Sequence, residues 1–391
     1  MENFRFFSPT EFIFGKDSEL EIGNLLKKVK AKKILIHFGG GSIIRSGLLS
    51  RIETILKEEK ITYLKLGGVL PNPRSGLVYE GIELCKKEQV DFVLAIGGGS
   101  AIDSAKAIAA GAKYDGDFWD FYDQKASITD ALPVGVILTI PAAGSEGSQS
   151  SVITLENGML KRGTVSKFYR PVFSIINPEL TYSLPMYQTA AGIVDMMSHI
   201  FERYLTKSKG VQLTDRLSEA TLISIIEASR QILINPNDYE ARSTICWAGT
   251  IAHNGILGVG RIEDWATHGL EHELSALYDV THGAGLAVMF PSYMRYTVDE
   301  DVNRYYQLAT TVFGVSGNLQ NKKEVALKGI DALESFFKEI GMPTSFKEIK
   351  AKEEDIDKLI EKLKVNRGNH FGSFKKLSLD DAKKIYMFAC K

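Results

Sequence analysis

The stretch DFVLAIGGGSAIDSAKAIAAGAK, residues 91–113, decides the fold class of this chain. Its first six residues form a short apolar run typical of a buried strand, and residues 101–113 have the spacing of a helix. Three consecutive glycines, Gly97, Gly98 and Gly99, join the two segments. Glycine lets the backbone turn tightly, because no Cβ intervenes. The stretch therefore predicts a strand, a tight turn and a helix, the unit from which parallel α/β sheets are built.

The glycine turn also predicts a phosphate-binding site. We expect Ser100 to be the N-cap of the following helix, with Asp103 completing a carboxylate variant of the capping box. A helix N-terminus presents free N–H groups and a partial positive charge, which suit a pyrophosphate. The alternative is an ordinary strand-to-helix turn, although three glycines lose more backbone entropy than such a turn needs. The motif is neither a G-x-G-x-x-G fingerprint nor a Walker A loop.

The same alternation of strands and helices extends to about residue 180. Further strands are expected at residues 32–38, 61–66 and 134–140, and helices at residues 46–59 and 77–89. From about residue 183, helical segments follow one another without strands. We therefore predict a Rossmann-like α/β dinucleotide-binding domain over residues 1–182 and an all-helical, metal-binding catalytic domain over residues 183–391. A length of 391 residues agrees with two domains.

Composition excludes several classes of protein. The formal net charge is −1, which gives no reason to expect nucleic acid or an anionic membrane surface as a partner. The three cysteines are far apart, so we expect no disulfide framework and a reducing, cytoplasmic location. No run approaches the roughly twenty apolar residues of a membrane span, and the first residues do not resemble a secretion signal.

A second Gly-Gly-Gly-Ser motif, in HFGGGSIIRSG, bears on the choice of nicotinamide nucleotide. Here Gly40, Gly41 and Ser42 follow a predicted strand, with Arg45 nearby. NAD-selective sites commonly place a carboxylate against the adenosine ribose 2′-hydroxyl, and that carboxylate would repel the 2′-phosphate of NADP. Since glycines and a hydroxyl tolerate the phosphate, NADP(H) is favoured over NAD(H). If the glycines merely shape the turn, NAD is equally acceptable.

Four side chains in the second half of the chain predict a metal site. Asp195 and His199 lie four residues apart in the helical stretch AAGIVDMMSHIFERYL, and therefore on one helix face. His268 and His272 repeat this spacing, and His282 follows beside a glycine. Three imidazoles and one carboxylate suit Fe(II) or Zn(II) better than Mg²⁺ or Ca²⁺. One such helical pair alone would more often be a polar core pair, but two pairs and a further histidine favour a metal.

The segments GGGSAIDSAKAIA, TIPAAGSEGS, INPELTYSLP, VDMMSHIFE, AHNGILGVGR and DWATHGLEHELSALYDVTHGAGLAVMFP together resemble the iron-containing (group III) alcohol dehydrogenases. Within that family the chain looks most like the butanol dehydrogenase-type, aldehyde-reducing branch. The resemblance implies that the metal ligands are Asp195, His199, His268 and His282. It implies cofactor contacts at Gly40, Gly41, Ser42, Gly97, Gly98, Gly99, Ser100, Asp103, Thr139, Ser145 and Lys161.

Other positions qualify this resemblance. Related enzymes that favour NAD have an aspartate at the position of Gly40. Ala143 stands where members commonly have threonine, and Ser148 where many have asparagine, so a cofactor hydrogen bond is expected to be missing there.

The chemistry implied is hydride transfer between nicotinamide C4 and a carbonyl carbon, with the metal as Lewis acid between the two domains. Substrates would be small aliphatic aldehydes and primary alcohols such as butanol, and the enzyme would be a homodimer. His272 is the candidate proton relay, and helix packing is the alternative for it. Alternative functions are a zinc-dependent polyol dehydrogenase of the glycerol type, a nucleotide-free metallohydrolase and a catalytically inactive nucleotide-binding regulator.

Overall fold

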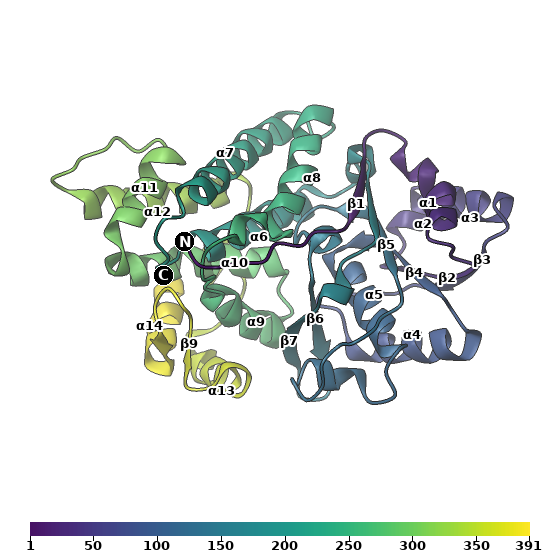
Figure 1. The fold of residues 1–391 in the computed structure, drawn as a ribbon. Coiled ribbons are helices and arrows are strands. Elements are labelled where there is room, and N and C mark those ends of the chain that lie inside the picture. Colours follow the sequence, from purple (N-terminus) through teal and green to yellow (C-terminus); the bar gives the residue numbers. More distant parts are fainter. The chain divides into compact units, whose positions relative to one another are not determined.

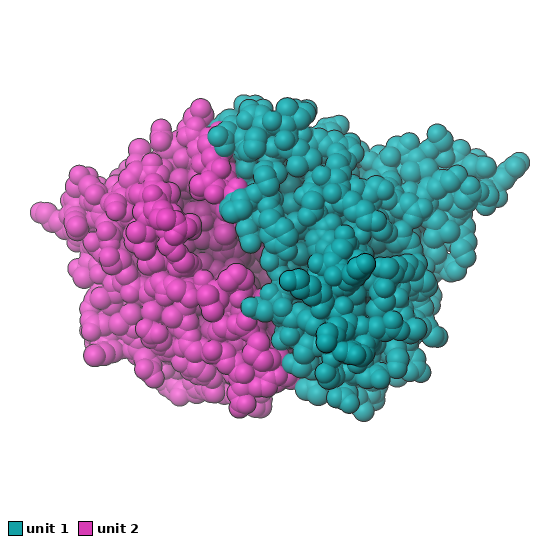
Figure 2. Space-filling model, turned by 180° about the vertical axis from the view of Figure 1, so that it is seen from behind, with its two compact units in different colours: residues 1–6, 185–391 teal, residues 7–184 magenta.

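The computed structural model describes all residues from Met1 to Lys391, and they form two compact units (Figures 1 and 2). The sheet unit is Phe7–Leu184, and the helical unit combines Met1–Phe6 with Pro185–Lys391. The first six residues, which we expected in the α/β domain, group with the helical unit. The Glu2 backbone N–H donates to the Gly260 carbonyl oxygen at 2.8 Å, which ties the chain's start to that unit.

The sheet unit contains a parallel sheet of six strands in the order β1-β8-β5-β4-β2-β3. These strands are β1 (Glu11–Phe14), β2 (Lys33–Phe38), β3 (Thr62–Leu66), β4 (Phe92–Gly98), β5 (Val134–Ile140) and β8 (Phe173–Ile176). The predicted α/β class and all four predicted strands are confirmed. Strands β1 and β8 were not predicted, because four residues are too few to show a periodicity.

Helices connect these strands. The helices of the sheet unit are α1 (Ile22–Lys28), α2 (Ser42–Arg45), α3 (Leu48–Glu58), α4 (Ser75–Glu88) and α5 (Gly99–Gly111), with short 3₁₀ turns at η1 (Ser18–Glu21), η2 (Phe118–Phe121), η3 (Ser145–Gly147), η4 (Lys167–Tyr169) and η5 (Pro178–Thr181). A separate antiparallel hairpin, β6 (Ser150–Leu155) with β7 (Leu160–Val165), was not predicted. Because β2, β4 and β5 are neighbouring parallel strands, their carboxyl ends meet at one sheet edge.

The helical unit confirms the prediction of a helical second half. Its helices are α6 (Met186–Tyr204), α7 (Gln212–Ile234), α8 (Tyr239–His253), α9 (Ala266–Tyr278), α10 (His282–Thr297), α11 (Val302–Thr311), α12 (Lys322–Glu339), α13 (Ile356–Arg367) and α14 (Leu379–Ala389), with 3₁₀ turns η6 (Ile256–Gly258), η7 (Val298–Glu300) and η8 (Glu353–Asp355). It departs from an all-helical unit in one small ladder, where β9 (His370–Phe371) pairs with β10 (Leu377–Ser378). Strands of two residues leave no pattern in a sequence.

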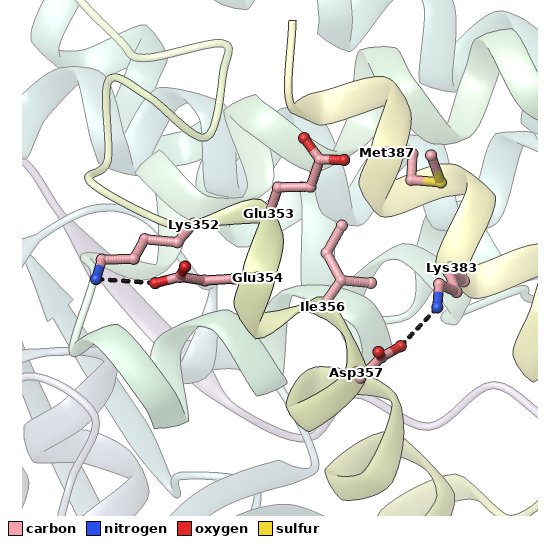
Figure 3. Close-up of a pocket in the computed structure, with 7 residues that line it drawn as sticks. All are labelled: Lys352, Glu353, Glu354, Ile356, Asp357, Lys383 and Met387. Carbon is pink, nitrogen blue, oxygen red and sulfur yellow. Dashed lines mark hydrogen bonds and ion pairs between the residues drawn. The ribbon is translucent and has the colours of Figure 1, made fainter.

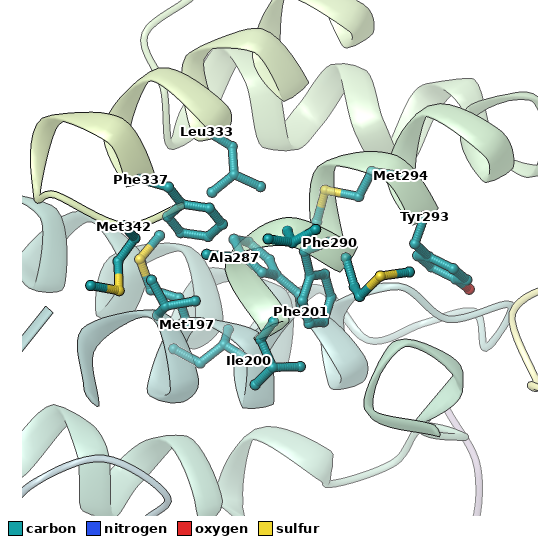
Figure 4. Close-up of a cluster of buried hydrophobic side chains, with 14 of the residues drawn as sticks. Met197, Ile200, Phe201, Ala287, Phe290, Tyr293, Met294, Leu333, Phe337 and Met342 are labelled. Atoms are coloured by element: carbon teal, nitrogen blue, oxygen red, sulfur yellow. The ribbon is translucent and has the colours of Figure 1, made fainter. Parts of the chain in front are cut away.

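An apolar core fixes α6 and α10 in this unit. Met197 and Phe201 of α6 pack with Phe290 of α10 and with Phe337 and Met342, all of them buried (Figure 4). Burying a side chain of this size stabilises a fold by about 1.5–3 kcal/mol. The core therefore holds in place the two helices that carry three of the four predicted metal ligands.

No helix is both long enough and apolar enough to cross a lipid bilayer.

Candidate metal centre and nucleotide loop

The four predicted metal ligands come together within the helical unit. Asp195 and His199 are both buried on α6, with His199 Nδ1 3.6 Å from Asp195 Oδ1. His268 is on α9, and His282 is the first residue of α10, with its Nε2 3.7 Å from Asp195 Oδ1. The ligand atoms of Asp195, His268 and His282 all lie within 4.8 Å of one another. Helix α6 and the two consecutive helices α9 and α10, much later in the chain, thus supply one polar cluster.

Two glycines let α10 approach the other helices closely. A Cβ atom at Gly283 would lie only 1.9 Å from the backbone carbonyl oxygen of Ala191 on α6. A Cβ at Gly285 would lie 2.6 Å from Oε1 of Glu271 on α9. Since real Cβ contacts are longer than this, only glycine allows the first turn of α10 to pack here. The Gly-x-Gly sequence after His282 is therefore what brings this histidine to Asp195.

Two buried glutamates orient two of the histidines. Glu202 Oε1 lies 2.7 Å from His268 Nδ1, and Glu271 Oε2 is hydrogen-bonded to His282 Nδ1. A carboxylate at Nδ1 holds the tautomer with its proton there, which leaves the lone pair on Nε2 for a metal. Neither glutamate was predicted. The spacing of Asp195, His199 and Glu202, at i, i+4 and i+7 on one helix, was the signal that could have revealed the first of them.

The electrostatics of the cluster fit a divalent cation. Burial, together with the nearby His268 and Arg203, lowers the pKa of His199 well below its usual value, so this imidazole is neutral. Its Nδ1 is buried and has no hydrogen-bond partner, an arrangement that costs free energy unless a cation is bound. Two ligands of a tetrahedral first-row ion lie about 3.4 Å apart, and the distances of 3.6 and 3.7 Å agree with this spacing.

His272, the predicted proton relay, lies beside this cluster. It is buried on α9, and its ring centroid is 5.7 Å from that of His282 and 6.4 Å from that of His268. Its ligand atom groups with those of Glu271 and His282 rather than with Asp195. The ligand atoms of Asp195, His268 and His282 form what we call the Asp195-centred group, and His272 is not a member of it. The structure nevertheless places His272 close enough to act on a substrate at the cluster.

Aromatic rings cover another side of the cluster. The Trp265 ring lies 5.0 Å from that of His268 and 5.7 Å from that of His199. His253, at the end of α8, stacks obliquely at 4.2 Å from His199 and lies 3.2 Å from Arg203 Nη2. The Arg203 guanidinium also packs over the Trp265 ring at 4.9 Å. The rings of Trp265 and His253 therefore line this side of the cluster, and the Arg203 guanidinium packs against both of them.

The glycine turn after β4 differs from the prediction in its capping. Helix α5 begins at Gly99, its N-cap is Gly98, and no side chain caps it, so the predicted Ser100 N-cap and capping box are wrong. The strand runs on through Gly98, and the helix therefore starts earlier than expected. The Asp103 carboxylate instead accepts hydrogen bonds from Ser145 Oγ at 2.5 Å and from the Val152 backbone N–H at 2.9 Å.

The glycines of this turn also meet a packing requirement. A Cβ at Gly98 would lie 2.7 Å from Cβ of Ile140 in β5, and one at Gly97 would lie 2.8 Å from Cβ of Ala101. The turn thus packs closely against the end of the neighbouring strand. Its backbone N–H groups at the start of α5 remain suited to a phosphate.

The other predicted cofactor contacts lie in the sheet unit as well. Gly40 and Gly41 lie between β2 and α2, Ser42 is the first residue of α2, and Thr139 is near the end of β5. They therefore share the sheet edge with the glycine turn. The Arg45 side chain folds back over this loop, since a Cβ at Gly41 would lie 2.5 Å from its Nη1.

Lys161 and Ser145 have protein partners. Lys161 Nζ, on β7, donates to Asn72 Oδ1 at 2.9 Å. Ser145, in η3, is hydrogen-bonded to Asp103 and to the buried Lys106, which was not predicted as a functional residue.

A surface hollow in the helical unit has a different character (Figure 3). It is lined by Lys352, Glu353, Glu354, Ile356, Asp357, Lys383 and Met387. Its charges pair with one another, Lys352 with Glu354 at 3.1 Å and Lys383 with Asp357 at 2.6 Å (Figure 3). None of its residues belongs to the histidine cluster, so we do not assign the active site to it.

Comparison with known proteins identifies the family. Residues 9–178 match the family model described as iron-containing alcohol dehydrogenase, and residues 189–390 match the model of that family's C-terminal part. The chain belongs to the iron-containing alcohol dehydrogenase family, as the resemblance implied.

Individual relatives match over almost their full length. The probable NADH-dependent butanol dehydrogenase 2 of Bacillus subtilis is 44% identical over 97% of this chain and 98% of its own. The NADPH-dependent aldehyde reductase YqhD of Escherichia coli is 33% identical, with 99% of both chains covered. The crystal structure of NADH-dependent butanol dehydrogenase A from Thermotoga maritima superimposes with a TM-score of 0.97 at 40% identity, covering 100% of this chain and 99% of that one.

The protein is thus an oxidoreductase of the alcohol dehydrogenase class, with a metal and a nicotinamide cofactor, as the sequence predicted. The alternatives outside that class, a metallohydrolase and an inactive regulator, are not needed to explain its residues.

Proposed function

We propose that this protein interconverts small aliphatic aldehydes and primary alcohols such as butanol, with a divalent metal held by Asp195, His199, His268 and His282. The observation that carries the proposal is the convergence of Asp195, His268 and His282 within 4.8 Å, two of the imidazoles being oriented by buried glutamates. Butanol dehydrogenases among the relatives, at 38–44% identity over nearly the whole chain, support this substrate class.

The residues of the chain have distinct tasks in this reaction. When bound, the metal supplies a Lewis acid for the carbonyl oxygen, and the nicotinamide supplies or accepts the hydride. Asp195 brings the negative charge that compensates a buried cation. Glu202 and Glu271 hold the Nδ1 protons of His268 and His282. In the reducing direction, a ring N–H of His272 gives its proton to the product alcohol oxygen, and burial of this residue limits exchange with bulk water.

The pyrophosphate of the cofactor is assigned to the turn formed by Gly97, Gly98 and Gly99 together with Ser100. The free N–H groups and the partial positive charge at the start of α5 support this assignment. Further contacts are assigned to the residues predicted from the resemblance, Asp103, Thr139, Ser145 and Lys161. Because the Ser145 hydroxyl donates to Asp103, it can meet the cofactor only as an acceptor.

For the adenosine end we propose a preference for NADP(H). Gly40, Gly41 and Ser42 offer no carboxylate at the end of β2, and Arg45 folds over Gly41. A guanidinium beside this loop would attract a 2′-phosphate. Against this stand the names of the four butanol dehydrogenase relatives, which are called NADH-dependent, whereas the YqhD protein is called NADPH-dependent. Specificity constants measured with both nucleotides decide the question.

The function is tested by stripping the metal and reconstituting the protein with Fe(II) or Zn(II). Butanal-dependent oxidation of NADPH and NADH is then measured for each form. Activity that returns with a metal and depends on the aldehyde is the expected result. Turnover of glycerol in clear preference to butanol would instead favour the polyol alternative, and activity that survives complete metal removal would contradict the proposed role of the metal.

We also propose a homodimer and a cytoplasmic location. Strand β1 is an edge of the sheet, and Phe7 before it and Phe14 within it are exposed. An open edge with exposed apolar side chains favours association with a second copy. Light scattering after gel filtration measures the oligomeric state. Two of the three cysteines are buried and none forms a disulfide bond, which agrees with a reducing compartment.

A further inference from the structure

Lys106 is a fully buried lysine in the middle of α5, the helix that begins at the glycine turn. Most of its helix is alanine, glycine and isoleucine, so the ammonium group is conspicuous there. Its Nζ lies within hydrogen-bond distance of five oxygens, all in the segment Gly144–Ser150, which we call the serine loop. The partners are Ser145 O at 2.7 Å, Ser145 Oγ at 2.8 Å, Ser148 O at 3.1 Å, Ser148 Oγ at 3.3 Å and Ser150 O at 3.0 Å.

These bonds explain why a lysine is buried at this position. Removing an ammonium group from water is costly unless it is fully hydrogen-bonded. An ammonium has only three N–H donors, so the five oxygens saturate it. In return, this one side chain donates to the backbone carbonyls of Ser145, Ser148 and Ser150. The packing of the loop against α5 therefore depends on Lys106.

Other residues of the sheet unit hold the same loop. Asp103, one helical turn before Lys106, accepts from Ser145 Oγ and from the Val152 backbone N–H, just beyond the loop. Arg170 donates to the Gly147 carbonyl oxygen, and Ser174 Oγ donates to the Glu146 carbonyl oxygen at 2.7 Å. Lys106 is the one that joins the two ends of the loop, at Ser145 and at Ser150, directly to α5.

The loop and the glycine turn are also in contact. The loop follows β5, and β5 pairs with β4 up to the turn. A Cβ at Gly99 would lie 3.1 Å from Cβ of Ala143, immediately before the loop. Because Lys106 and the turn share one helix, a fixed loop has a fixed position relative to the turn.

We propose that Lys106 is a positioning residue for cofactor binding, whose ammonium clamps the serine loop to α5 so that loop and glycine turn form one preorganised surface for the nucleotide. This inference rests on the proposed function. Preorganisation raises affinity because the ordering of a loop has already occurred before binding. Lys106 itself touches protein oxygens only, and it acts through the loop.

The test compares Lys106→Met with Ser104→Ala. The methionine has nearly the same length as lysine and lacks the three donors. Ser104 is a matched control, since it is buried on the same helix but is hydrogen-bonded to His37 Nε2 at 2.8 Å rather than to the loop. NADPH and NADH affinities are measured by fluorescence titration, and the metal content and melting temperature of each protein are determined. Hydrogen exchange of residues 144–150 is measured without nucleotide.

We expect Lys106→Met to speed exchange in the serine loop and to raise the nucleotide Kd and KM about tenfold or more. Metal content and the KM for the aldehyde should stay the same, a split that general destabilisation would not produce. Ser104→Ala should bind nucleotide as the wild type does. Faster exchange with an unchanged Kd would overturn the proposal, because the clamp would then not serve the cofactor.

If Lys106→Met does not fold, hydrogen exchange in the wild-type protein still tests the proposal. Residues 144–150 should exchange slowly in it before any nucleotide is added, and rapid exchange there would overturn the clamp. The nucleotide titration of the wild-type protein tests the proposed function separately. A wild-type protein that binds neither nucleotide would contradict the proposed function, and the Lys106 proposal, which rests on it, would fall as well. We expect slow exchange of residues 144–150 and tight nucleotide binding in the wild type. In Lys106→Met we expect both to be lost.

Discussion

Glu202 accepts two hydrogen bonds from His268, one from the ring Nδ1 at 2.7 Å and one from the backbone N–H at 2.9 Å. The same carboxylate oxygen therefore fixes both the position of the α9 backbone and the orientation of the ring. Burial raises the pKa of Glu202 to about 7, against the opposing effect of the hydrogen bonds from the backbone of His268 and Trp265. Such a carboxylate behind a histidine both orients the ligand and increases its basicity.

Replacing Glu202 by glutamine should weaken metal binding about tenfold or more, because the ring loses the charge that makes it a better ligand. Metal affinity is measured by competition with a chelator, independently of activity. Glu273→Gln is the matched control, since Glu273 is equally buried on α9 and accepts from Asn366 rather than from a histidine. Equal metal affinity in the two variants would contradict the role of Glu202.

His268→Ala should lose the metal and abolish turnover, while nucleotide affinity stays close to that of the wild type. The reason is that His268 belongs to the helical unit, whereas both Gly-Gly-Gly-Ser motifs belong to the sheet unit. Metal analysis and fluorescence titration with NADPH measure the two effects separately. Full metal content in an active variant would remove His268 from the ligand set.

Gly40→Asp should shift the preference from NADPH towards NADH. A Cβ at Gly40 meets no atom within 4 Å, so the substitution should not disturb the loop. The new carboxylate would repel the 2′-phosphate of NADPH by on the order of a few kcal/mol when partly desolvated. The ratio of kcat/KM values for the two nucleotides is the measurement. An unchanged ratio would show that Gly40 does not lie beside the adenosine ribose.

His272→Ala should keep the metal but lower turnover about a hundredfold, the usual effect of losing a general acid–base group. The metal would stay because the Asp195-centred group does not include His272. Metal stoichiometry and kcat are measured on the same preparation. Loss of metal would make His272 a ligand or a support for one, and an unchanged kcat would make it a packing residue.

Lys106 should give the stability of the protein a specific pH dependence. Burial lowers its pKa from 10.5 to about 8, although Asp103 and Glu146 act in the opposite direction and Arg170 adds to the lowering. Between these two values the unfolded chain holds the Lys106 proton and the folded chain does not. The free energy of unfolding therefore rises with pH across this window.

This contribution is absent from Lys106→Met. The stability of the wild type relative to the variant should accordingly increase by on the order of 2 kcal/mol between about pH 7.5 and about pH 9.5. Urea unfolding of both proteins at the two pH values measures it. A difference that stays constant or decreases would mean that Lys106 keeps its proton in the folded protein.

Much of the fold followed from local patterns in the sequence. The apolar runs before Gly97 and Gly40 predicted buried strands, since a strand with both faces covered needs apolar residues throughout. Four-residue spacings placed Asp195 with His199, and His268 with His272, on single helix faces. These features depend on neighbours within one or two helical turns, which is why the sequence alone determined them.

The tertiary structure decided how these pieces meet. Helical spacing places Glu202 on the same face of α6 as Asp195 and His199, but no local pattern indicates that Glu202 reaches His268, 66 positions away, or that Gly283 lets α10 contact α6. The capping box predicted for Ser100 and Asp103 is wrong because α5 already begins at Gly99, and the Asp103 carboxylate instead accepts hydrogen bonds from Ser145 and Val152, which are distant in sequence. Chain spacing reports which residues share a face of one element. Which faces then pack together depends on side-chain volume and on the satisfaction of buried polar groups, and both are properties of the folded chain as a whole.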